Sequence, residues 1–126
     1  MNNLQMSLAG NATFSSLSGL GLIFLHQKIA ELFHLENTTV FWVLGIGLLF
    51  FAITILIQIK KQNRKGVLFI IVQDLLWVVG SLLLLILNPF SISSFGNIAI
   101  GIVAGIVLLF AILQWLSLPQ SNSNSN

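Results

Sequence analysis

The sequence predicts an all-α polytopic membrane protein, an antiparallel bundle of four transmembrane helices. Of its 126 residues, 56% are hydrophobic and only 6% are charged, whereas soluble chains carry roughly 25% charged residues. Four apolar segments are each long enough to cross a hydrocarbon core of about 30 Å, which takes about 20 helical residues. Short polar stretches connect these segments, and short connections favour antiparallel neighbours.

The first apolar segment, residues 8–29, contains many small and hydroxyl-bearing residues. This composition predicts a helix that faces protein over much of its circumference. Apolar residues from Leu25 to Phe33 then recur at helical spacing between polar ones, which predicts an amphipathic extension in the membrane interface. No basic region precedes the segment and no small-residue cleavage pattern follows it, so we expect it to be retained rather than cleaved as a signal peptide.

The second segment, residues 40–59, carries no charged side chain. Trp42 near its start is typical of an aromatic anchor at the membrane interface. Asn37, Thr38 or Thr39 can cap its first turn through a side-chain oxygen.

The third segment, residues 66–87, follows directly from a basic loop and carries one ionisable side chain, Asp74. Asn88-Pro89 ends it, because proline cannot continue a helix. Its length and apolarity are typical of a transmembrane helix.

The fourth segment, residues 95–116, is rich in glycine and stops before Pro119. Residues 1–119 are therefore expected to form one four-helix transmembrane domain. The remaining Asn/Ser-rich tail, residues 120–126, is too short and polar to pack, so we expect it to be disordered.

The charges predict the orientation. Four of the five basic residues lie in the loop between the second and third segments: Lys60, Lys61, Arg64 and Lys65. By the positive-inside rule this loop is cytoplasmic, and four crossings then place both termini in the cytoplasm. We interpret these basic residues as a signal for membrane topology. We therefore expect the protein to contact the lipid bilayer and to bind no nucleic acid.

Asp74 is the sharpest candidate for a functional residue. A carboxylate at this depth costs on the order of 2.5 to 3.5 kcal/mol, so it must face the bundle interior, be protonated, or both. The candidate intramembrane polar site comprises Asp74, Gln73, Trp77, Ser81 and Thr54. Further polar groups expected at similar depth are Ser15, Ser16 or Ser18, with Gln58 and Gln114 at shallower positions.

Three interpretations of Asp74 are open. It can be a proton or cation site, as intramembrane carboxylates often are. It can be a structural hydrogen-bond hub with a neutral carboxyl group. Its side chain can also be drawn toward Lys60, Lys61 or Arg64 in the basic loop. No second carboxylate or histidine lies in the apolar core of the segments to continue a proton relay.

Two pairs of small residues, Gly101 with Gly105 and Ser15 with Gly19, have the spacing of helix-packing motifs. Such pairs pack against a neighbouring helix of the same chain or form a homodimer contact.

His26 and His34 are the only histidines, and Glu31 and Glu36 lie near them. Two histidines and a carboxylate can hold a metal, and a histidine can ligate haem, but no ligand motif is present and interfacial polar residues are the simpler interpretation. The chain has no cysteine and no nucleophile, phosphate or dinucleotide motif. We therefore expect no cofactor, no metal and no catalytic residues.

Three strings carry a family resemblance: residues 17–19 (LSG), 42–48 (WVLGIGL) and 74–81 (DLLWVVGS). With the basic loop between the last two, they resemble a group of small, generally uncharacterised bacterial four-helix membrane proteins, loosely similar to DoxX-type bundles. The resemblance implies a four-helix bundle in a bacterial plasma membrane and no catalytic residues.

The expected function is that of a non-enzymatic accessory or scaffolding membrane protein that binds a larger membrane partner or assembles as a homo-oligomer. One alternative is a small oligomeric transporter or channel that uses Asp74. A second alternative is a membrane protein that holds a cofactor or takes part in redox chemistry through His26 or His34.

Overall fold

The computed structural model describes residues 2–88 and 92–119, and within them the chain is all-helical with five helices and no strand. The helices are α1 (Asn3–Phe24), α2 (His26–Phe33), α3 (Thr39–Lys61), α4 (Arg64–Leu87) and α5 (Ser94–Leu116). The all-helical class predicted from the sequence is confirmed for these residues. The predicted tail, residues 120–126, and Pro89 lie outside them.

Three helices, α3, α4 and α5, are long and apolar enough to cross a membrane, and α1 with α2 provides a fourth span if this bent pair counts as one. Large apolar side chains point outward along these helices: Phe24 is 77% exposed and Ile86 76%. Extended exposed apolar surface marks a membrane or partner contact in a folded chain. The structure therefore has the character of a multi-pass membrane protein.

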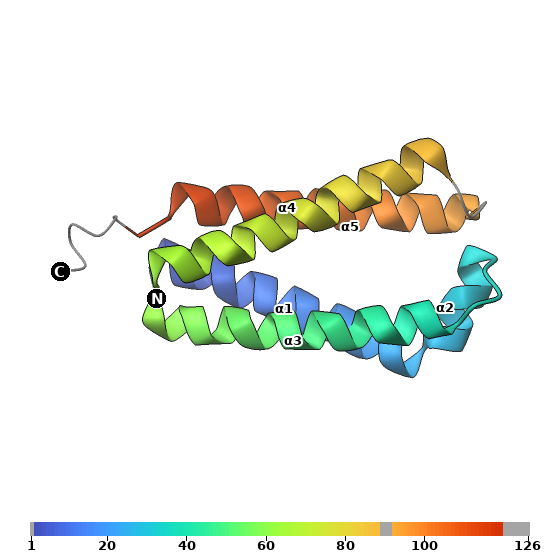
Figure 1. The fold of residues 1–126 in the computed structure, drawn as a ribbon, viewed down its shortest axis with the longest axis horizontal. Helices are drawn as coiled ribbons and strands as arrows, with labels where there is room; N and C mark the ends of the chain where they lie inside the picture. Colours follow the sequence, from blue (N-terminus) through green and yellow to red (C-terminus); the bar gives the residue numbers. More distant parts are fainter. Residues whose placement is uncertain (1, 89–91, 120–126) are drawn as a thin grey trace.

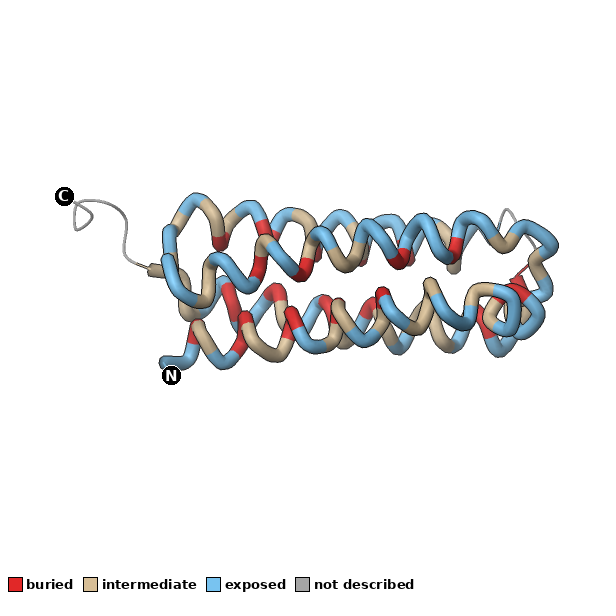
Figure 2. The backbone as a smooth tube through the Cα atoms, turned by 90° about the horizontal axis from the view of Figure 1, so that it is seen from below, coloured by how far each residue is buried: buried red, intermediate tan, exposed pale blue. Residues whose placement is uncertain are grey.

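The four long helices run along the long axis of the molecule, and α2 crosses it at one end (Figure 1). The most extensive packing is between α1 and α3 and between α4 and α5, and α1 also contacts α5. Buried residues face the space between the two helix pairs (Figure 2).

Helix α1 begins at Asn3, earlier than the start near residue 8 that the sequence predicts. The cause is a capping box: Asn2 Oδ1 accepts from the Gln5 backbone N–H at 2.8 Å, and Gln5 Oε1 accepts from the Asn2 N–H at 3.2 Å. The helix stops at Phe24, and the chain turns by 89° into α2. Residues 8–29 are therefore not one straight helix, and the predicted amphipathic extension is the separate helix α2.

The other long helices begin within two residues of their predicted starts. Helices α4 and α5 have a side-chain N-cap, whereas Thr38, the N-cap residue of α3, makes no side-chain cap bond. Asn37 Oδ1 accepts from the Thr39 N–H at 2.9 Å at the start of α3. Asn63 Oδ1 accepts from the Lys65 N–H at 3.0 Å at the start of α4. These bonds satisfy backbone donors that a helix leaves unpaired at its first turn.

Ser93 begins α5 and also ties it to α2. Its Oγ accepts from the Gly96 N–H at 3.0 Å and donates to the Leu32 carbonyl oxygen at 2.6 Å. Its backbone N–H donates to the Phe33 carbonyl oxygen at 3.2 Å. These bonds fix α2 across the start of α5.

The closest helix contact is between α1 and α3, where Gly19 faces Gly45. A Cβ atom on Gly19 would lie 2.8 Å from the Gly45 carbonyl oxygen, and one on Gly45 would lie 2.6 Å from the Gly19 carbonyl oxygen. Only glycine fits on either side, so the two backbones touch directly, as membrane helices do at small residues.

The apolar core lies toward the end of the molecule that carries the basic loop, residues 60–65. It draws on four helices: Leu4, Leu8 and Ala12 of α1, Ile55 of α3, Val67, Ile70 and Ile71 of α4, and Ala111 of α5. These residues pack against one another and fill the interior of the bundle near the basic loop.

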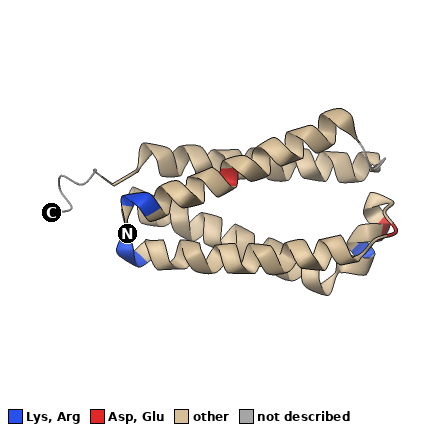
Figure 3. Ribbon diagram, viewed as in Figure 1, with Lys and Arg blue, Asp and Glu red and all other residues tan. Residues whose placement is uncertain are grey.

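Both ends of the described chain lie at this same basic end. The Asn2 side-chain N–H donates to Gln62 Oε1 at 2.6 Å, and Arg64 Nη1 donates to the Pro119 carbonyl oxygen at 2.7 Å. The remaining surface charges lie on and beside α2 at the opposite end, and Asp74 is the charged residue between them (Figure 3).

Candidate functional site

Asp74 projects from α4 into the bundle and is only 2% exposed. Its Oδ2 atom accepts two hydrogen bonds, from Asn11 Nδ2 of α1 at 2.8 Å and from Gln114 Nε2 of α5 at 2.9 Å. The carboxyl group therefore joins three helices at one point.

The two amides are also bonded to each other. Asn11 Nδ2 donates to Gln114 Oε1 at 2.9 Å, and Ser15 Oγ, one turn along α1, donates to Asn11 Oδ1 at 3.3 Å. We call Asn11, Ser15, Asp74 and Gln114 the polar cluster. Asn11 is 1% exposed and Gln114 is fully buried, so the cluster is enclosed by protein.

Apolar residues surround the polar cluster on each helix that contributes to it. Leu8 and Ala12 flank Asn11 on α1, Ile70 and Ile71 precede Asp74 on α4, and Ala111 precedes Gln114 on α5. Low local polarity strengthens hydrogen bonds and raises the penalty for leaving a polar group unpaired. The hydrogen bonds of the cluster therefore connect α1, α4 and α5 within apolar surroundings.

The other members of the predicted polar site do not join this cluster in the described residues. Thr54 Oγ1 donates to the Phe51 carbonyl oxygen of its own helix at 2.6 Å. Ser81 is buried, Gln73 and Trp77 are half-buried, and none of them has a hydrogen bond to Asp74 in the described part of the chain.

Ser15, predicted at similar depth, reaches Asp74 through Asn11, and Gln114, predicted at a shallower position, contacts Asp74 directly. Gln58 instead caps the α3–α4 turn, where its Oε1 accepts from the Asn63 N–H at 2.9 Å. Ser16 and Ser18 are half-buried.

Asn11 is the partner that sequence reasoning missed. With α1 beginning near residue 8, Asn11 would lie only about 5 Å inside the membrane edge, whereas Asp74 lies about 10 Å inside it. With α1 beginning at Asn3, it lies about 12 Å along the helix at ~1.5 Å per residue, close to the depth of Asp74. The Asn2-x-x-Gln5 capping box is the sequence feature that would have shown this start.

The side chain of Asp74 is not drawn toward the basic loop. Its bonds go to Asn11 and Gln114, and the Arg64 guanidinium group bonds to the Pro119 carbonyl oxygen instead. Lys60, Lys61 and Lys65 are exposed at the basic end (Figure 3).

The predicted packing residues separate into two groups. Ser15 and Gly19 lie inside the protein, in the polar cluster and at the contact with Gly45. Gly101 has only an ordinary contact with Leu85 at 3.9 Å, and a Cβ atom on Gly105 would meet nothing within 4 Å. Gly105 thus has no packing neighbour within the described chain.

His26 and His34 lie at opposite ends of the short helix α2. His34 caps it in the left-handed conformation (φ 60°), and His26 Nδ1 is buried with no hydrogen-bond partner in the described residues. Within residues 2–88 and 92–119, no group of three His, Cys, Asp or Glu side chains comes close enough to hold a metal ion.

Comparison of the chain with protein-family models, with curated proteins and with solved structures finds no match. The resemblance to DoxX-type bundles therefore stays a prediction.

Proposed function

We propose that the protein is a non-enzymatic accessory or scaffolding component of a bacterial plasma membrane, built as an antiparallel bundle of four transmembrane helices. In this proposal α1 with α2 makes the first crossing, and α3, α4 and α5 make the others. The basic loop and both termini are cytoplasmic, in accordance with the positive-inside rule. The position of Asn2 and Pro119 beside this loop supports an even number of crossings.

The observation that carries the proposal is the presence of exposed glycines on α4 and on α5. Gly80 and Gly105 are exposed, and a Cβ atom on either would meet nothing within 4 Å. Glycine inside a helix costs about 1 kcal/mol relative to alanine, and nothing within the chain offsets that cost here. In membranes, such glycines let a second helix approach closely. In this proposal a transmembrane helix of a larger partner packs against the exposed glycines of α4 and α5.

The polar cluster supports a structural role for Asp74. Its two amide bonds lie within one chain and join three helices. A scaffold needs a fixed relative placement of its helices, and the cluster supplies it.

Transport is the second candidate, and its support is the burial of a carboxyl group among apolar residues in a predicted span. A pathway would require several copies of this small bundle around Asp74. Vesicles containing the purified protein separate the two candidates. A transporter loses proton- or cation-coupled flux in Asp74→Asn, whereas a scaffold shows no such flux in either form.

The scaffold is tested by comparing Gly105→Leu with Gly47→Leu after in-membrane cross-linking and native mass spectrometry from a gentle detergent. Gly47 is a control for the added bulk, because it is equally exposed but lies on α3, outside the proposed contact on α4 and α5. We expect Gly105→Leu to lose the bound partner and Gly47→Leu to keep it. Equal recovery from both variants contradicts the proposal, and recovery of a second copy alone identifies a homo-oligomer.

A further inference from the structure

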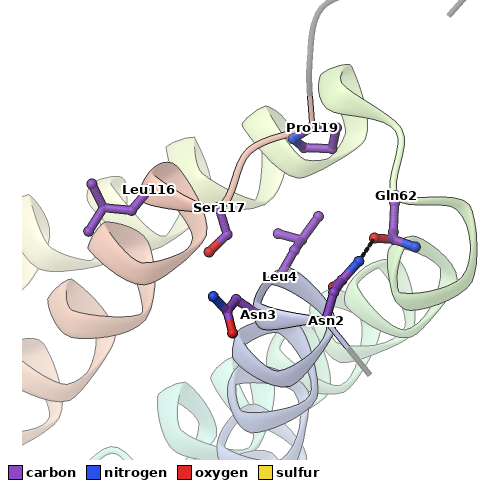
Figure 4. Close-up of a pocket in the computed structure, with 7 residues that line it drawn as sticks. All are labelled: Asn2, Asn3, Leu4, Gln62, Leu116, Ser117 and Pro119. Carbon is purple, nitrogen blue, oxygen red and sulfur yellow. Dashed lines mark hydrogen bonds between the residues drawn. The ribbon is translucent and has the colours of Figure 1, made fainter. Parts of the chain in front are cut away.

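A cleft of about 330 Å³ lies at the basic end, between the first turn of α1, the α3–α4 loop and the end of α5. Asn3, Gln62 and Ser117 contribute polar side chains to its wall, and Leu4 and Leu116 contribute apolar ones. Figure 4 shows the side chains of Asn3 and Ser117 pointing toward each other across the opening, with Leu4 between the helices. Three separate elements therefore form one concave site.

The polar wall offers hydrogen-bond donors. Asn3 has a side-chain amide and Ser117 a hydroxyl group. Gln62 lines the cleft beside Asn2, where its Oε1 accepts from the Asn2 side chain, and its amide nitrogen points away from the cleft (Figure 4). Converging neutral donors of this kind suit an anionic oxygen.

Basic residues lie at the same end of the molecule as the cleft (Figure 3). Lys60 and Lys61 directly precede Gln62, and the Arg64 guanidinium group is 2.7 Å from the carbonyl oxygen of Pro119, which lines the cleft. The chain has only three acidic side chains: Asp74 in the polar cluster, and Glu31 and Glu36 at the opposite end (Figure 3). No carboxylate of the described residues neutralises the cations around the cleft.

We propose that this cleft binds the phosphate group of an anionic phospholipid headgroup. The phosphate oxygens accept from the Asn3 amide and the Ser117 hydroxyl group, and the neighbouring lysines supply the charge. The acyl chains then lie along the outer face of α5, where Leu116 is 75% exposed. This inference is independent of the scaffold proposed above, because it uses neither Asp74 nor Gly105.

The test is native mass spectrometry and fluorescence quenching with the full chain in nanodiscs that contain phosphatidylcholine with or without phosphatidylglycerol. We expect phosphatidylglycerol to stay bound and phosphatidylcholine to be lost. Asn3→Asp repels phosphate without adding bulk, and an acidic residue in a first helical turn favours the helix, so α1 stays folded. We expect it to lower phosphatidylglycerol retention at least fivefold, and Lys61→Gln to lower it about fivefold.

Lys28→Gln is the matched control, because it removes one positive charge at the opposite end of the molecule. Unchanged retention in Lys28→Gln, with a loss in Asn3→Asp and Lys61→Gln, supports the site. Equal losses in all three variants, or no loss in Asn3→Asp, overturn it. Inorganic phosphate is tested alone on lipid-free protein in detergent: binding that Asn3→Asp removes assigns the site to free phosphate, and absence of binding assigns it to the lipid headgroup.

Discussion

Replacing Asp74 by leucine separates membrane insertion from folding, because the two should change in opposite directions. Leucine is about 3 to 4 kcal/mol easier to insert at a helix centre than aspartate. The substitution also removes both hydrogen bonds to Oδ2, one from α1 and one from α5. The variant should therefore insert more readily and yet hold its helices together less firmly.

The magnitude follows from the number of bonds. Interhelical hydrogen bonds in membranes average about 0.6 kcal/mol and reach about 1.7 kcal/mol, so losing two costs about 1 to 3 kcal/mol of unfolding free energy. Asp74→Asn keeps one oxygen that can accept from both Asn11 and Gln114, so it should cost less than Asp74→Leu. Thr54→Val is the matched control: Thr54 bonds only to its own helix, so its removal should cost less than about 0.5 kcal/mol.

The assay is reversible unfolding in mixed micelles of mild detergent and sodium dodecyl sulfate, followed by tryptophan fluorescence. Trp77 lies three residues from Asp74 on α4 and reports on this region. An Asp74→Leu variant that is as stable as the natural protein, or more stable, refutes the view that the polar cluster holds the bundle together.

Three further predictions use the same unfolding assay. Gly45→Leu should prevent the backbone contact with Gly19 and lower the free energy of unfolding by about 1 to 3 kcal/mol, whereas Gly47→Leu should be close to neutral. Equal effects of the two substitutions would contradict the close contact of α1 with α3 at Gly19 and Gly45. His34→Gly should stabilise the fold by about 1 kcal/mol, since glycine adopts the left-handed φ of 60° without strain, and a loss of stability would contradict this reason. Asn2→Ala removes the α1 cap and should cost about 1 kcal/mol, with amide exchange in the first turn of α1 increasing; unchanged exchange would show that the capping box is dispensable.

Helix positions follow from the sequence because apolar length and end signals are local properties. Asn63 caps α4, and Asn37 accepts from the first backbone N–H of α3, both where the polar stretches suggested a start. The bend at Leu25 could not be predicted, since no proline or glycine pair marks it and the helical periodicity continues into α2.

The polar cluster was only partly predictable, because helix rotation and vertical register depend on packing between helices. Depth along the chain suggested Ser15 and Thr54 equally as neighbours of Asp74, and it placed Gln114 nearer the membrane edge. Thr54 bonds within its own helix instead, and Asn11 takes the central position. The contact between Gly19 and Gly45 brings α1 and α3 together, and such pairing between distant segments is not encoded in the spacing of either segment alone.

The most direct test of the threading through the membrane is single-cysteine labelling in intact cells, which is clean because the natural chain has no cysteine. Glu36→Cys lies in the α2–α3 connection and Asn3→Cys at the basic end, and both positions are exposed. With a membrane-impermeant maleimide, we expect Glu36→Cys to react in intact cells and Asn3→Cys to react only after permeabilisation. Equal labelling of both positions in intact cells would contradict a bundle that crosses the bilayer with its basic end in the cytoplasm.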